Sequence, residues 1–307
     1  MSKVSVVVPS YNQASFISAC LDSILRQTKK DYEIIVVDDA SSDNTSEVIK
    51  SYLTKIKYIR NSKNLGLYSL TCNIGIKQAT GDYILIVAAD DWLAPTILEE
   101  EAVILDQNPG IGLVYSQSTR IEGNKPLLII HKIAGKQNYI GRDDFENLLT
   151  TGDFISSINV LARKKIYNKV GLFDTHLKYM ADYEMWIRIA KDYPLAYIAK
   201  PLSFYRIHGN NMHLNSDFEN KTRVEFKYIL KKYFSKNLDK RMVKIKKNTY
   251  HAYNRKTAIN KIVEGNLKTA FIYWWRAYKE KPLSILTWQA IQPYYFFMKK
   301  SLKKHNA

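Results

Sequence analysis

The sequence predicts an α/β protein built on a mostly parallel, Rossmann-like sheet, followed by an α-helical C-terminal extension. Short, continuously apolar runs such as VSVVV and EIIVV are typical of parallel strands that are buried on both faces. They alternate with stretches of helical periodicity, which supply the crossovers between parallel strands. The extension is predicted from a change of pattern after Asn215, where helices rich in Lys, Tyr and Phe begin.

The predicted elements follow one another in a regular order. Strands are expected at residues 4–8, 32–37, 57–60 and 83–87, and helices at 15–27, 42–52 and 70–78. The later pattern predicts a helix at 96–107, a strand at 112–116, a loop or hairpin at 121–141, a strand and helix within 152–169, a helix at 181–192 and a strand at 196–207. Ligands of such sheets bind at the carboxyl ends of the strands, so segments 9–12, 38–43 and 88–91 mark the expected site.

Length and composition predict a folded protein. At 307 residues with 46% hydrophobic content, the chain is able to bury one large core or two unequal ones. The opening segment passes from one Lys through a short apolar run into polar residues, which predicts neither a secretory signal nor a membrane span. Cys20 and Cys72 lie far apart without a CxxC motif, which argues against a disulfide framework or a structural zinc site. We expect a cytosolic protein with reduced cysteines.

The positive charge is concentrated at the end of the chain. The net charge is +17, and residues 216–307 hold 22 Lys and Arg against 6 Asp and Glu. A near-neutral front half and a basic, aromatic-rich back half predict two roles, the second facing a polyanion such as phospholipid headgroups or nucleic acid. A solvated helix surface is the simpler explanation. No known nucleic-acid motif occurs, so contact with a membrane surface is favoured over nucleic acid.

The first acidic cluster, Asp38-Asp39-Ala-Ser-Ser-Asp43, follows a predicted buried strand and precedes a helix. Helix capping explains Ser42 or Asp43, because such side chains accept hydrogen bonds from free backbone N–H groups. A pair of aspartates at the edge of the sheet is more than a cap needs. Carboxylates there could also accept hydrogen bonds from a nucleotide base or ribose, so both interpretations stay open.

The second acidic cluster, Asp90 and Asp91, follows the apolar strand YILIV. Two adjacent carboxylates repel each other unless a cation lies between them and a diphosphate. Hard oxygen ligands favour magnesium or manganese. The alternative, a cap for the next helix, is weakened by Pro95, which is typical of a first helical residue.

Two further positions are candidates for chemistry. Asp182, at the start of a predicted helix, could act as a general base toward an acceptor alcohol or as a helix N-cap. His208 follows the last predicted strand and could complete a metal site, although a lone His is more often an ordinary surface or core residue.

Six segments occur in one order along residues 3–212: VSVVVPSYN, EIIVVDDASSDNT, NLGLYSLTCNIGIKQATGDYI, AADDWL, GLFDTHLKYMADYEMWIRI and YRIHGNN. Together they resemble family 2 glycosyltransferases of the bacterial cell-surface polysaccharide type. The resemblance implies the GT-A nucleotide-diphospho-sugar transferase fold and an inverting reaction. An aspartate deprotonates the acceptor hydroxyl, which attacks the anomeric carbon while a metal-bound nucleoside diphosphate leaves.

The resemblance also implies site residues. Those expected to bind the nucleotide are Pro9, Ser10, Tyr11, Asn12, Asp38, Asp39, Asn73 and Asp90. Tyr11 is suited to cover the base, and Asp39 to contact it. The residues expected to bind Mn²⁺ or Mg²⁺ are Asp91, Asp90 and His208. Asp182 matches the catalytic base.

Three positions depart from the family pattern. Ala88 stands where the family usually has the first aspartate of an Asp-X-Asp motif, so metal affinity rests on the remaining ligands. Thr71-Cys72-Asn73 replaces Ala-Arg-Asn, which removes a cation near the nucleotide and suggests a different donor preference. Ala181 replaces an acidic neighbour of the base.

The domain prediction is a GT-A catalytic domain at residues 1–215 and a basic helical region at 216–307. Within the second region, residues 257–281 resemble a helical hairpin of the tetratricopeptide kind, and 283–304 predict an interfacial, non-spanning segment. The expected enzyme is cytoplasmic and peripheral on the inner face of the cell membrane. It transfers a hexosyl or N-acetylhexosaminyl group from a UDP-sugar to a cell-surface glycan or lipid-linked saccharide.

Two other functions stay open at this point. The departures at Ala88, Cys72 and Ala181 are consistent with a catalytically weak or inactive nucleotide-sugar-binding or scaffold protein of a glycan assembly system. A nucleotidyltransferase with a similar sheet is disfavoured, because no glycine-rich phosphate loop with a partnering Lys opens the chain.

Overall fold

The structure, a computed structural model, describes residues 2–123, 125–128, 138–141, 143–209, 211–214, 217–235 and 237–282. The chain divides into two compact units. The first comprises Met1–Phe145 and Asp153–Ile229, and the second comprises Glu146–Gly152 and Leu230–Ala307. The first unit contains the whole sheet.

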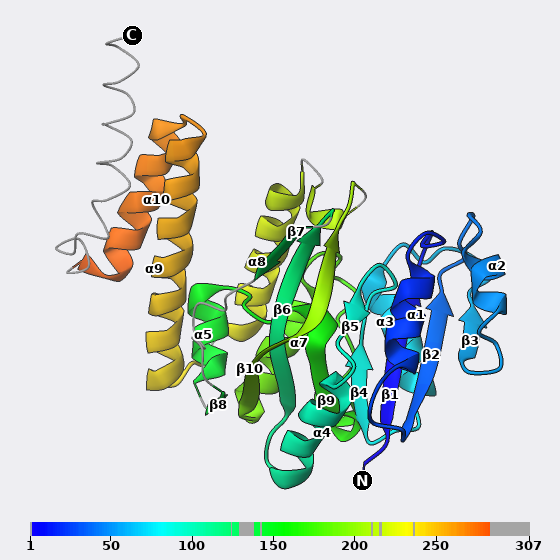
Figure 1. The fold of residues 1–307 in the computed structure, drawn as a ribbon. Coiled ribbons are helices and arrows are strands. Elements are labelled where there is room, and N and C mark those ends of the chain that lie inside the picture. The colour runs from blue at the N-terminus through cyan, green and yellow to red at the C-terminus, as the bar shows by residue number, and fades with distance from the viewer. Residues whose placement is uncertain are drawn as a thin grey trace. The chain divides into compact units, whose positions relative to one another are not determined.

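The strands of the first unit form one sheet, which has ten members among the described residues (Figure 1). Their bounds are β1 Val4–Ser10, β2 Tyr32–Asp38, β3 Lys57–Arg60, β4 Tyr83–Ile86, β5 Trp92–Leu93, β6 Leu113–Glu122, β7 Lys125–Leu128, β8 Tyr139–Gly141, β9 Val160–Arg163 and β10 Leu195–Ile207. The order is β3-β2-β1-β4-β9-β6-β10-β5, with β7 paired to β6 and β8 to β10. β3, β2, β1 and β4 are mutually parallel, as are β6 and β10, whereas β9 is antiparallel to both its neighbours.

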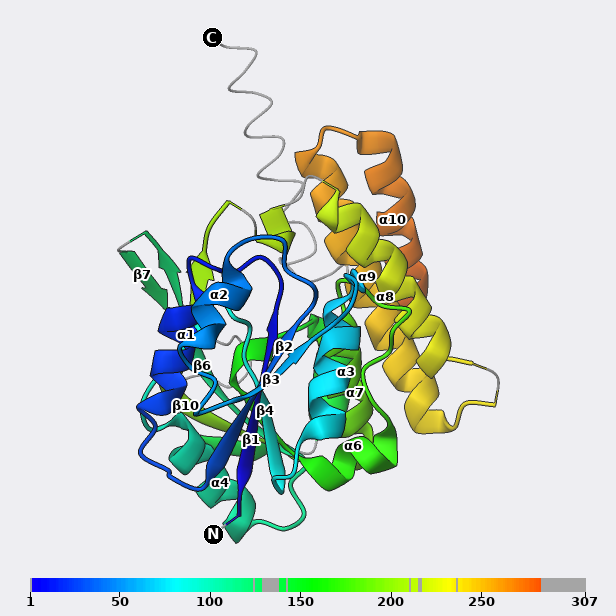
Figure 2. The same ribbon diagram turned by 90° about the vertical axis from the view of Figure 1, so that its right-hand side faces the viewer.

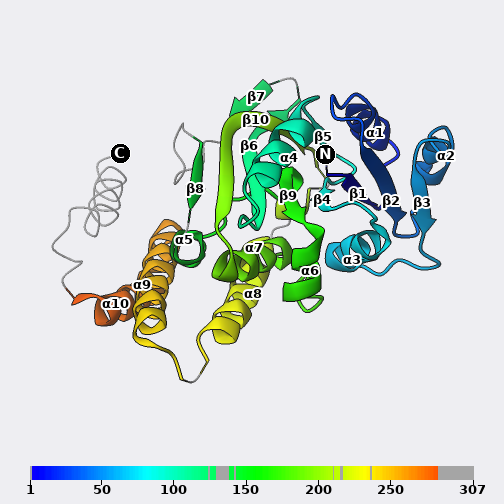
Figure 3. The ribbon, with the colours of Figure 1, turned by 90° about the horizontal axis from the view of Figure 1, so that it is seen from below.

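Helices cover both faces of this sheet. The helices along the described chain, including those of the second unit, are α1 Ile17–Leu25, α2 Thr45–Lys50, α3 Tyr68–Gln78, α4 Ile97–Gln107, α5 Asp144–Thr151, α6 Lys164–Val170, α7 Ala181–Asp192, α8 Phe218–Tyr233, α9 Lys240–Val263 and α10 Leu267–Glu280, with 3₁₀ turns at Ser157–Asn159 and Met212–Leu214. α1 and α4 lie on one face, and α3, α6 and α7 on the other (Figure 3). In Figure 2, α3, α6 and α7 lie on the side of the sheet away from α1.

Alternate residues of β1 explain why the sheet needs two covers. Val6 and Val8 belong to the core cluster that contains the apolar side of α1, including Ile17 and Leu21, and all four are fully buried. The intervening Val7 is equally buried and faces Gly75 of α3. Because neighbouring residues of a strand point to opposite faces, an unbroken apolar run is stable only between two layers. Each fully buried Val or Ile contributes about 1.5–3 kcal/mol relative to exposure.

The structure adds elements that the sequence pattern did not indicate. The two-residue strand β5 pairs with Ser203 and Phe204 of β10, and α5 forms where no helix was expected. Within the range interpreted as a loop or hairpin, β7 folds back on β6. Cys20 and Cys72 are buried and free.

The second unit includes α9 and α10, which lie side by side as an antiparallel hairpin (Figure 1). Asp239 caps α9 through the N–H of Met242, and Asn266 caps α10 through the N–H of Thr269. Of the helices in the described ranges, none combines the length and hydropathy needed to cross a bilayer. The predicted interfacial segment, residues 283–304, lies outside the described residues.

The close approach of α3 to β1 makes Gly75 sensitive to substitution. A Cβ at position 75 would overlap the side chain of Val7. Gly75→Ala gains about 1 kcal/mol of helix propensity but costs about 1–3 kcal/mol of overpacking, so we expect a net loss of about 1–2 kcal/mol in the free energy of unfolding. Urea denaturation would measure it. Gly110→Ala is the matched control, because nothing lies near a Cβ there. Equal stability of the two variants would contradict close packing at Gly75.

Candidate active site

Loops at the carboxyl ends of three neighbouring strands form the candidate site. β1 lies between β2 and β4 and runs parallel to both, so the segments that follow these strands leave the sheet at one edge. The N–H of Asp39 donates to the carbonyl of Ser10 at 2.8 Å, which joins the first two loops. Asn12 and Ala40 adopt φ of 54° and 58°, the left-handed conformation of tight turns.

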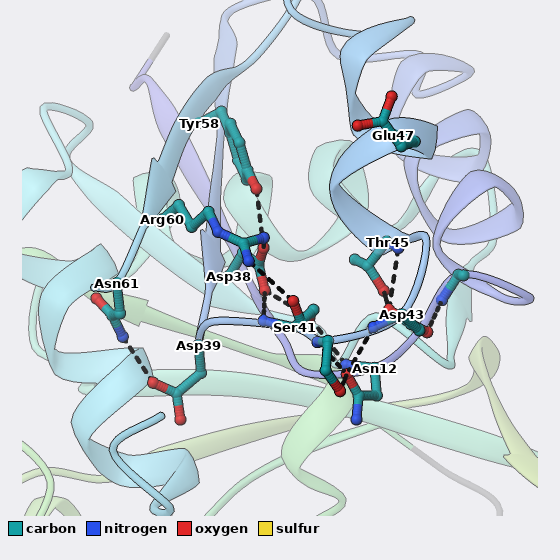
Figure 4. A network of polar contacts seen from close by, with 12 residues as sticks. Asn12, Asp38, Asp39, Ser41, Asp43, Thr45, Glu47, Tyr58, Arg60 and Asn61 are labelled. Atoms are coloured by element: carbon teal, nitrogen blue, oxygen red, sulfur yellow. Dashed lines mark hydrogen bonds and ion pairs between the residues drawn. The ribbon is translucent and has the colours of Figure 1, made fainter. Parts of the chain in front are cut away.

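Asp38 organises the loop after β2 from a fully buried position (Figure 4). One carboxylate oxygen accepts from the backbone N–H and the hydroxyl of Ser41. The other accepts from the Tyr58 hydroxyl and the Arg60 guanidinium, each at 2.8 Å. With both oxygens used by the chain itself, the geometry supports a role for Asp38 in holding the loop. Direct contact with a nucleotide stays a prediction.

Asn12 ties the first loop to the second. Its N–H donates to the Ser41 hydroxyl at 2.9 Å, and its side-chain oxygen accepts from the N–H of Ser42 at 2.8 Å (Figure 4). Asp43 accepts from the N–H groups of Thr45 and Ala14, at 2.9 and 3.1 Å. These hydrogen bonds fix the backbone of both loops before any ligand arrives.

Three other predicted residues lie on the first loop. Pro9 and Ser10 are buried, and the Ser10 hydroxyl has no hydrogen-bond partner among the described residues. Tyr11 is 44% exposed at the same edge of the sheet. An unsatisfied hydroxyl beside an exposed ring suits the recognition of a polar, planar ligand.

Asp39 and Asn73 bind other parts of the chain. Asp39 accepts from the side chain of Asn61 at 2.7 Å and from the N–H groups of Leu65 and Gly66 (Figure 4 draws the first of these). Asn73, buried on α3, donates to the carbonyl of Phe173 and accepts from its N–H, both at 2.9 Å. Asn73 therefore anchors a loop 100 residues away in sequence, and its predicted nucleotide contact remains untested.

Of the three predicted metal ligands, His208 and Asp90 come together. The imidazole Nε2 of His208 lies 3.0 Å from a carboxylate oxygen of Asp90. Arg206 donates from Nε to the carbonyl of Asp90 at 2.9 Å and from its backbone N–H to Asp91 at 2.8 Å. The Arg206 guanidinium lies over two aromatic rings, 5.0 Å from Phe16 and 4.5 Å from Trp92. Arg206 thus holds the acidic turn in place.

The second carboxylate oxygen of Asp91 is the clearest place for a ligand atom in this site. It is buried and has no hydrogen-bond partner among the described residues. Burial and then the neighbouring charge of Asp90 raise the pKa of Asp91 well above its ordinary value. A cation beside this oxygen would relieve both effects. Across the described ranges, no group of three or more His, Cys, Asp or Glu is placed to hold a metal. The chain therefore offers a partial ligand set of the kind that ligand phosphates complete.

Asp182 lies half-buried in the first turn of α7. Burial is the main cause that raises its pKa, and the charge of Glu225 raises it further. Glu225 accepts from the N–H groups of Lys178, Tyr179 and Met180, so it also fixes the chain that enters α7. A carboxylate with a raised pKa is a stronger base than an ordinary aspartate.

Two tyrosines connect Asp182 with the acidic turn. Burial raises the pKa of Tyr68, and the charges of Asp182 and Asp91 both raise it further. The pKa of Tyr205 is raised by burial and by the charges of Asp91, Asp90 and Asp182. Asp91 and Asp182 therefore act on the same two hydroxyls, although they lie on different elements.

Sequence reasoning missed Arg206, Tyr68, Tyr205 and Glu225. A signal existed for Arg206, because residues two apart on a strand share a face, and Arg206 lies two positions before the predicted His208. Tyr68 and Glu225 lack such a signal, since their role depends on contacts distant in sequence.

A hollow of about 500 Å³ lies away from these residues. It is lined by Pro109, Ile111, Arg163, Lys165, Asn168, Lys169 and Tyr193. Arg163 pairs with Tyr83, the first residue of β4, whereas the acidic turn follows the other end of that strand. The hollow is therefore separate from the candidate site.

Comparison with known sequences identifies a family. Residues 5–171 match Glycosyl transferase family 2. An uncharacterized glycosyltransferase of Haemophilus influenzae is 26% identical over 232 residues, which are 75% of this chain and 76% of the relative. Another, from Methanocaldococcus jannaschii, is 33% identical over 219 residues, covering 69% of this chain and 73% of the relative.

Comparison with solved structures identifies the fold. S. aureus TarS superposes with a TM-score of 0.64 at 20% identity, over 82% of this chain and 43% of that one. Its fragment 1–349 in complex with UDP-GlcNAc gives 0.63 at 17% identity, over 90% and 81%. A mannosyltransferase of Pyrobaculum calidifontis, in complex with GDP-Man and Mn²⁺, gives 0.63 at 19% identity, over 98% and 81%. These likenesses confirm the GT-A fold predicted from the sequence.

The buried network around Asp38 predicts a stability effect. Asp38→Ala removes all four hydrogen bonds and leaves the donors of buried Ser41 and half-buried Tyr58 unsatisfied, so we expect a loss of about 2–4 kcal/mol in the free energy of unfolding. Glu47→Ala is the matched control, because Glu47 is exposed and pairs with Lys50 alone among the described residues, which is worth at most about 1 kcal/mol. Chemical denaturation of both variants measures the difference. If Asp38→Ala cost no more than the control, the network would not organise the loop.

Proposed function

Because the chain belongs to glycosyl transferase family 2, we propose that this glycosyltransferase is an inverting, metal-dependent enzyme. It moves a hexosyl or N-acetylhexosaminyl group from a nucleotide-sugar donor, most simply a UDP-sugar, to a cell-surface glycan or lipid-linked saccharide. The observation that carries the proposal is the acidic turn after β4, where a buried oxygen of Asp91 has no hydrogen-bond partner among the described residues and His208 lies 3.0 Å from Asp90. It supports a centre that receives a cation together with the diphosphate of a donor.

The donor is proposed to bind across the loops after β1 and β2. Tyr11 is exposed and able to cover a base, and the unsatisfied Ser10 hydroxyl is able to donate to the donor. Asp39 would accept from a base N–H in exchange for, or alongside, the amides of Leu65 and Gly66. The complexes of TarS with UDP-GlcNAc and of the mannosyltransferase with GDP-Man support a nucleoside diphosphate sugar.

Asp91, Asp90 and His208 are proposed to hold the metal, Mn²⁺ or Mg²⁺. The fit rests on the buried, unpartnered oxygen of Asp91 and on the 3.0 Å approach of His208 to Asp90. A bound divalent cation stabilises negative charge on a leaving diphosphate. Mn²⁺ in the mannosyltransferase complex supports a divalent ion. Arg206 positions the turn by bonds to Asp90 and Asp91, so its contribution precedes the chemistry.

Asp182 is proposed to take the proton of the acceptor hydroxyl as the new glycosidic bond forms. The oxygen attacks the anomeric carbon from the side opposite the leaving diphosphate, which inverts the configuration there. Only the ionised carboxylate accepts the proton. Because burial raises the pKa of Asp182, its basicity is increased, and the pH at which it becomes active is raised as well.

The division of labour along the chain is also a proposal. Residues 1–215 would form the catalytic domain, and the basic region 216–307 would hold the enzyme on the inner face of the cell membrane, in the cytoplasm. The support is the concentration of charge, 22 Lys and Arg against 6 acidic residues in the second region. Such placement suits a lipid-linked acceptor.

A second candidate is a nucleotide-sugar-binding or scaffold protein with weak or no transfer activity. Ala88 favours it, since an alanine in this position supplies no metal ligand. This candidate predicts that a donor binds with metal but that no sugar is released or transferred.

A panel of nucleotide sugars with Mn²⁺ tests the proposed function. We expect one donor to release its nucleoside diphosphate, and a chelator to reduce the release to background, because the leaving group loses its cation. Coupled detection of the diphosphate measures both. Release of the diphosphate that persists in chelator would contradict the proposed metal dependence. Binding without release, even with glycolipid extract as acceptor, would favour the scaffold.

Asp182→Asn keeps the shape of the side chain and removes its basicity. We expect kcat to fall by about 10²–10⁴-fold while donor affinity, measured by calorimetry, stays within about twofold. Asp192→Asn, at the exposed end of the same helix, is the matched control and should keep full activity.

The pH dependence has a definite sign. Wild-type activity should rise with pH as Asp182 ionises, with its midpoint above the ordinary value of 3.8. A rate that is flat on the acid side, or Asp182→Asn with normal kcat, would remove Asp182 from the mechanism.

A further inference from the structure

Helix α10 exposes an apolar face although it is part of a packed hairpin. Ala270 and Ala277 are its buried residues, and they face α9. Leu267, Phe271, Ile272 and Trp275 are 51%, 60%, 43% and 45% exposed. Leu267, Phe271 and Trp275 are four residues apart and Ile272 is three before Trp275, so the four lie along one side of the helix. Four large apolar side chains in water form a surface that a soluble helix usually buries.

Cations are interleaved with these apolar side chains. Lys268, Arg276 and Lys279 are exposed on the same side of α10. The Arg276 guanidinium lies 5.2 Å from the Tyr273 ring centroid, and the Lys279 ammonium lies 5.8 Å from that of Trp275. Within α10, which the structure describes completely, this outward face carries no carboxylate. Glu280, the acidic residue of the helix, is half-buried.

The combination restricts the kind of partner. A second copy of the chain would place cations against cations over the same face, which costs free energy. Nucleic acid would use the cations and the aromatic rings, but aliphatic Leu267 and Ile272 gain nothing from phosphate or base contacts in that position. An anionic phospholipid surface satisfies both sets, since headgroup phosphates pair with the cations while aromatic and aliphatic side chains enter the interface.

The face is also pre-organised. Asn266 caps the helix through the N–H of Thr269 at 3.1 Å, and α9 supports its other side, where His251 Nδ1 lies 3.0 Å from the carbonyl of Ala277. No coil-to-helix transition has to accompany binding, so the cost of ordering is small. Val263, the last residue of α9, is 82% exposed.

We propose that the outward face of α10, defined by Leu267, Lys268, Phe271, Ile272, Trp275, Arg276 and Lys279, is the surface by which the chain docks on anionic phospholipid. The inference rests on the membrane contact in the proposed function and deepens it, because it assigns docking to one face of a folded helix. The aromatic residues enter the interfacial layer, and the three cations pair with headgroup phosphates.

Sedimentation of the full chain with vesicles tests the proposal without any donor. Phosphatidylcholine vesicles with and without phosphatidylglycerol are compared at low ionic strength. The double substitution Phe271→Ser and Trp275→Ser should reduce binding to anionic vesicles at least tenfold, whereas Leu53→Ser with Val103→Ser, exposed apolar residues of the first unit, should leave it unchanged. Thermal unfolding of all variants checks that they stay folded.

Two triple variants that remove the same charge distinguish binding through the α10 face from attraction by the overall charge of the region. Lys268→Gln, Arg276→Gln and Lys279→Gln together should weaken binding by roughly a hundredfold, about fivefold per cation near the surface. Lys244→Gln, Lys247→Gln and Arg255→Gln remove the same charge from exposed positions of α9 and should cost much less.

Three results would overturn the proposal. The first is an equal loss of vesicle binding in the two charge variants, and the second is unchanged vesicle binding by the Phe271→Ser, Trp275→Ser variant. The third is a wild-type protein that is dimeric without lipid and becomes monomeric in this double variant alone. Release of nucleoside diphosphate, assayed without vesicles and with glycolipid extract as acceptor, reports the proposed function separately. A chain that docks through α10 but releases no diphosphate in this assay would keep this inference and contradict the enzymatic proposal.

Discussion

The burial of parallel strands on both faces is the constraint on which the site depends. β1 is buried along its length and mostly apolar, and helices cover both of its sides, so polar groups that can reach a ligand lie at the ends of the strands. Because β2, β1 and β4 are parallel and adjacent, their carboxyl ends coincide. The same apolar runs that stabilise the sheet thereby gather Ser10, Asp39 and the Asp90 turn at one edge.

Charge at that edge is balanced by contacts made within the first unit. Asp38 is paired with Arg60 and satisfied by Ser41 and Tyr58, which leaves a rigid loop and no free carboxylate. Asp91 differs, because one carboxylate oxygen accepts a hydrogen bond from the backbone N–H of Arg206 and the other has no hydrogen-bond partner among the described residues. Two neighbouring aspartate clusters thus have opposite character. In one, the chain satisfies both oxygens of the buried aspartate, and in the other, one buried oxygen of Asp91 has no hydrogen-bond partner among the described residues.

The sequence located the site more securely than it assigned roles within it. Strand patterns predicted which ends meet, and so placed Asp39, Asp90 and Asp91 correctly at one edge of the sheet. The partners of Asp38 and Asn73 were beyond sequence reasoning, because Tyr58 and Phe173 approach them through packing of separate elements. Periodicity reports which face of an element a side chain occupies. It does not report which residues of the opposing element contact that side chain.

A consequence for ligand binding follows from the charges alone. Burial and the charges of Asp91, Asp90 and Asp182 all raise the pKa of Tyr205, and Arg206 contacts the turn that carries Asp90 and Asp91. A diphosphate adds further negative charge, which this neighbourhood opposes unless a divalent cation enters with it. In the proposed mechanism, donor and metal therefore assist each other's binding, and linkage requires the two effects to be equal in free energy. In the same mechanism, the alanine at position 88 supplies no carboxylate to the metal, so metal binding depends more on the donor, and a weak metal site by itself is compatible with an active enzyme.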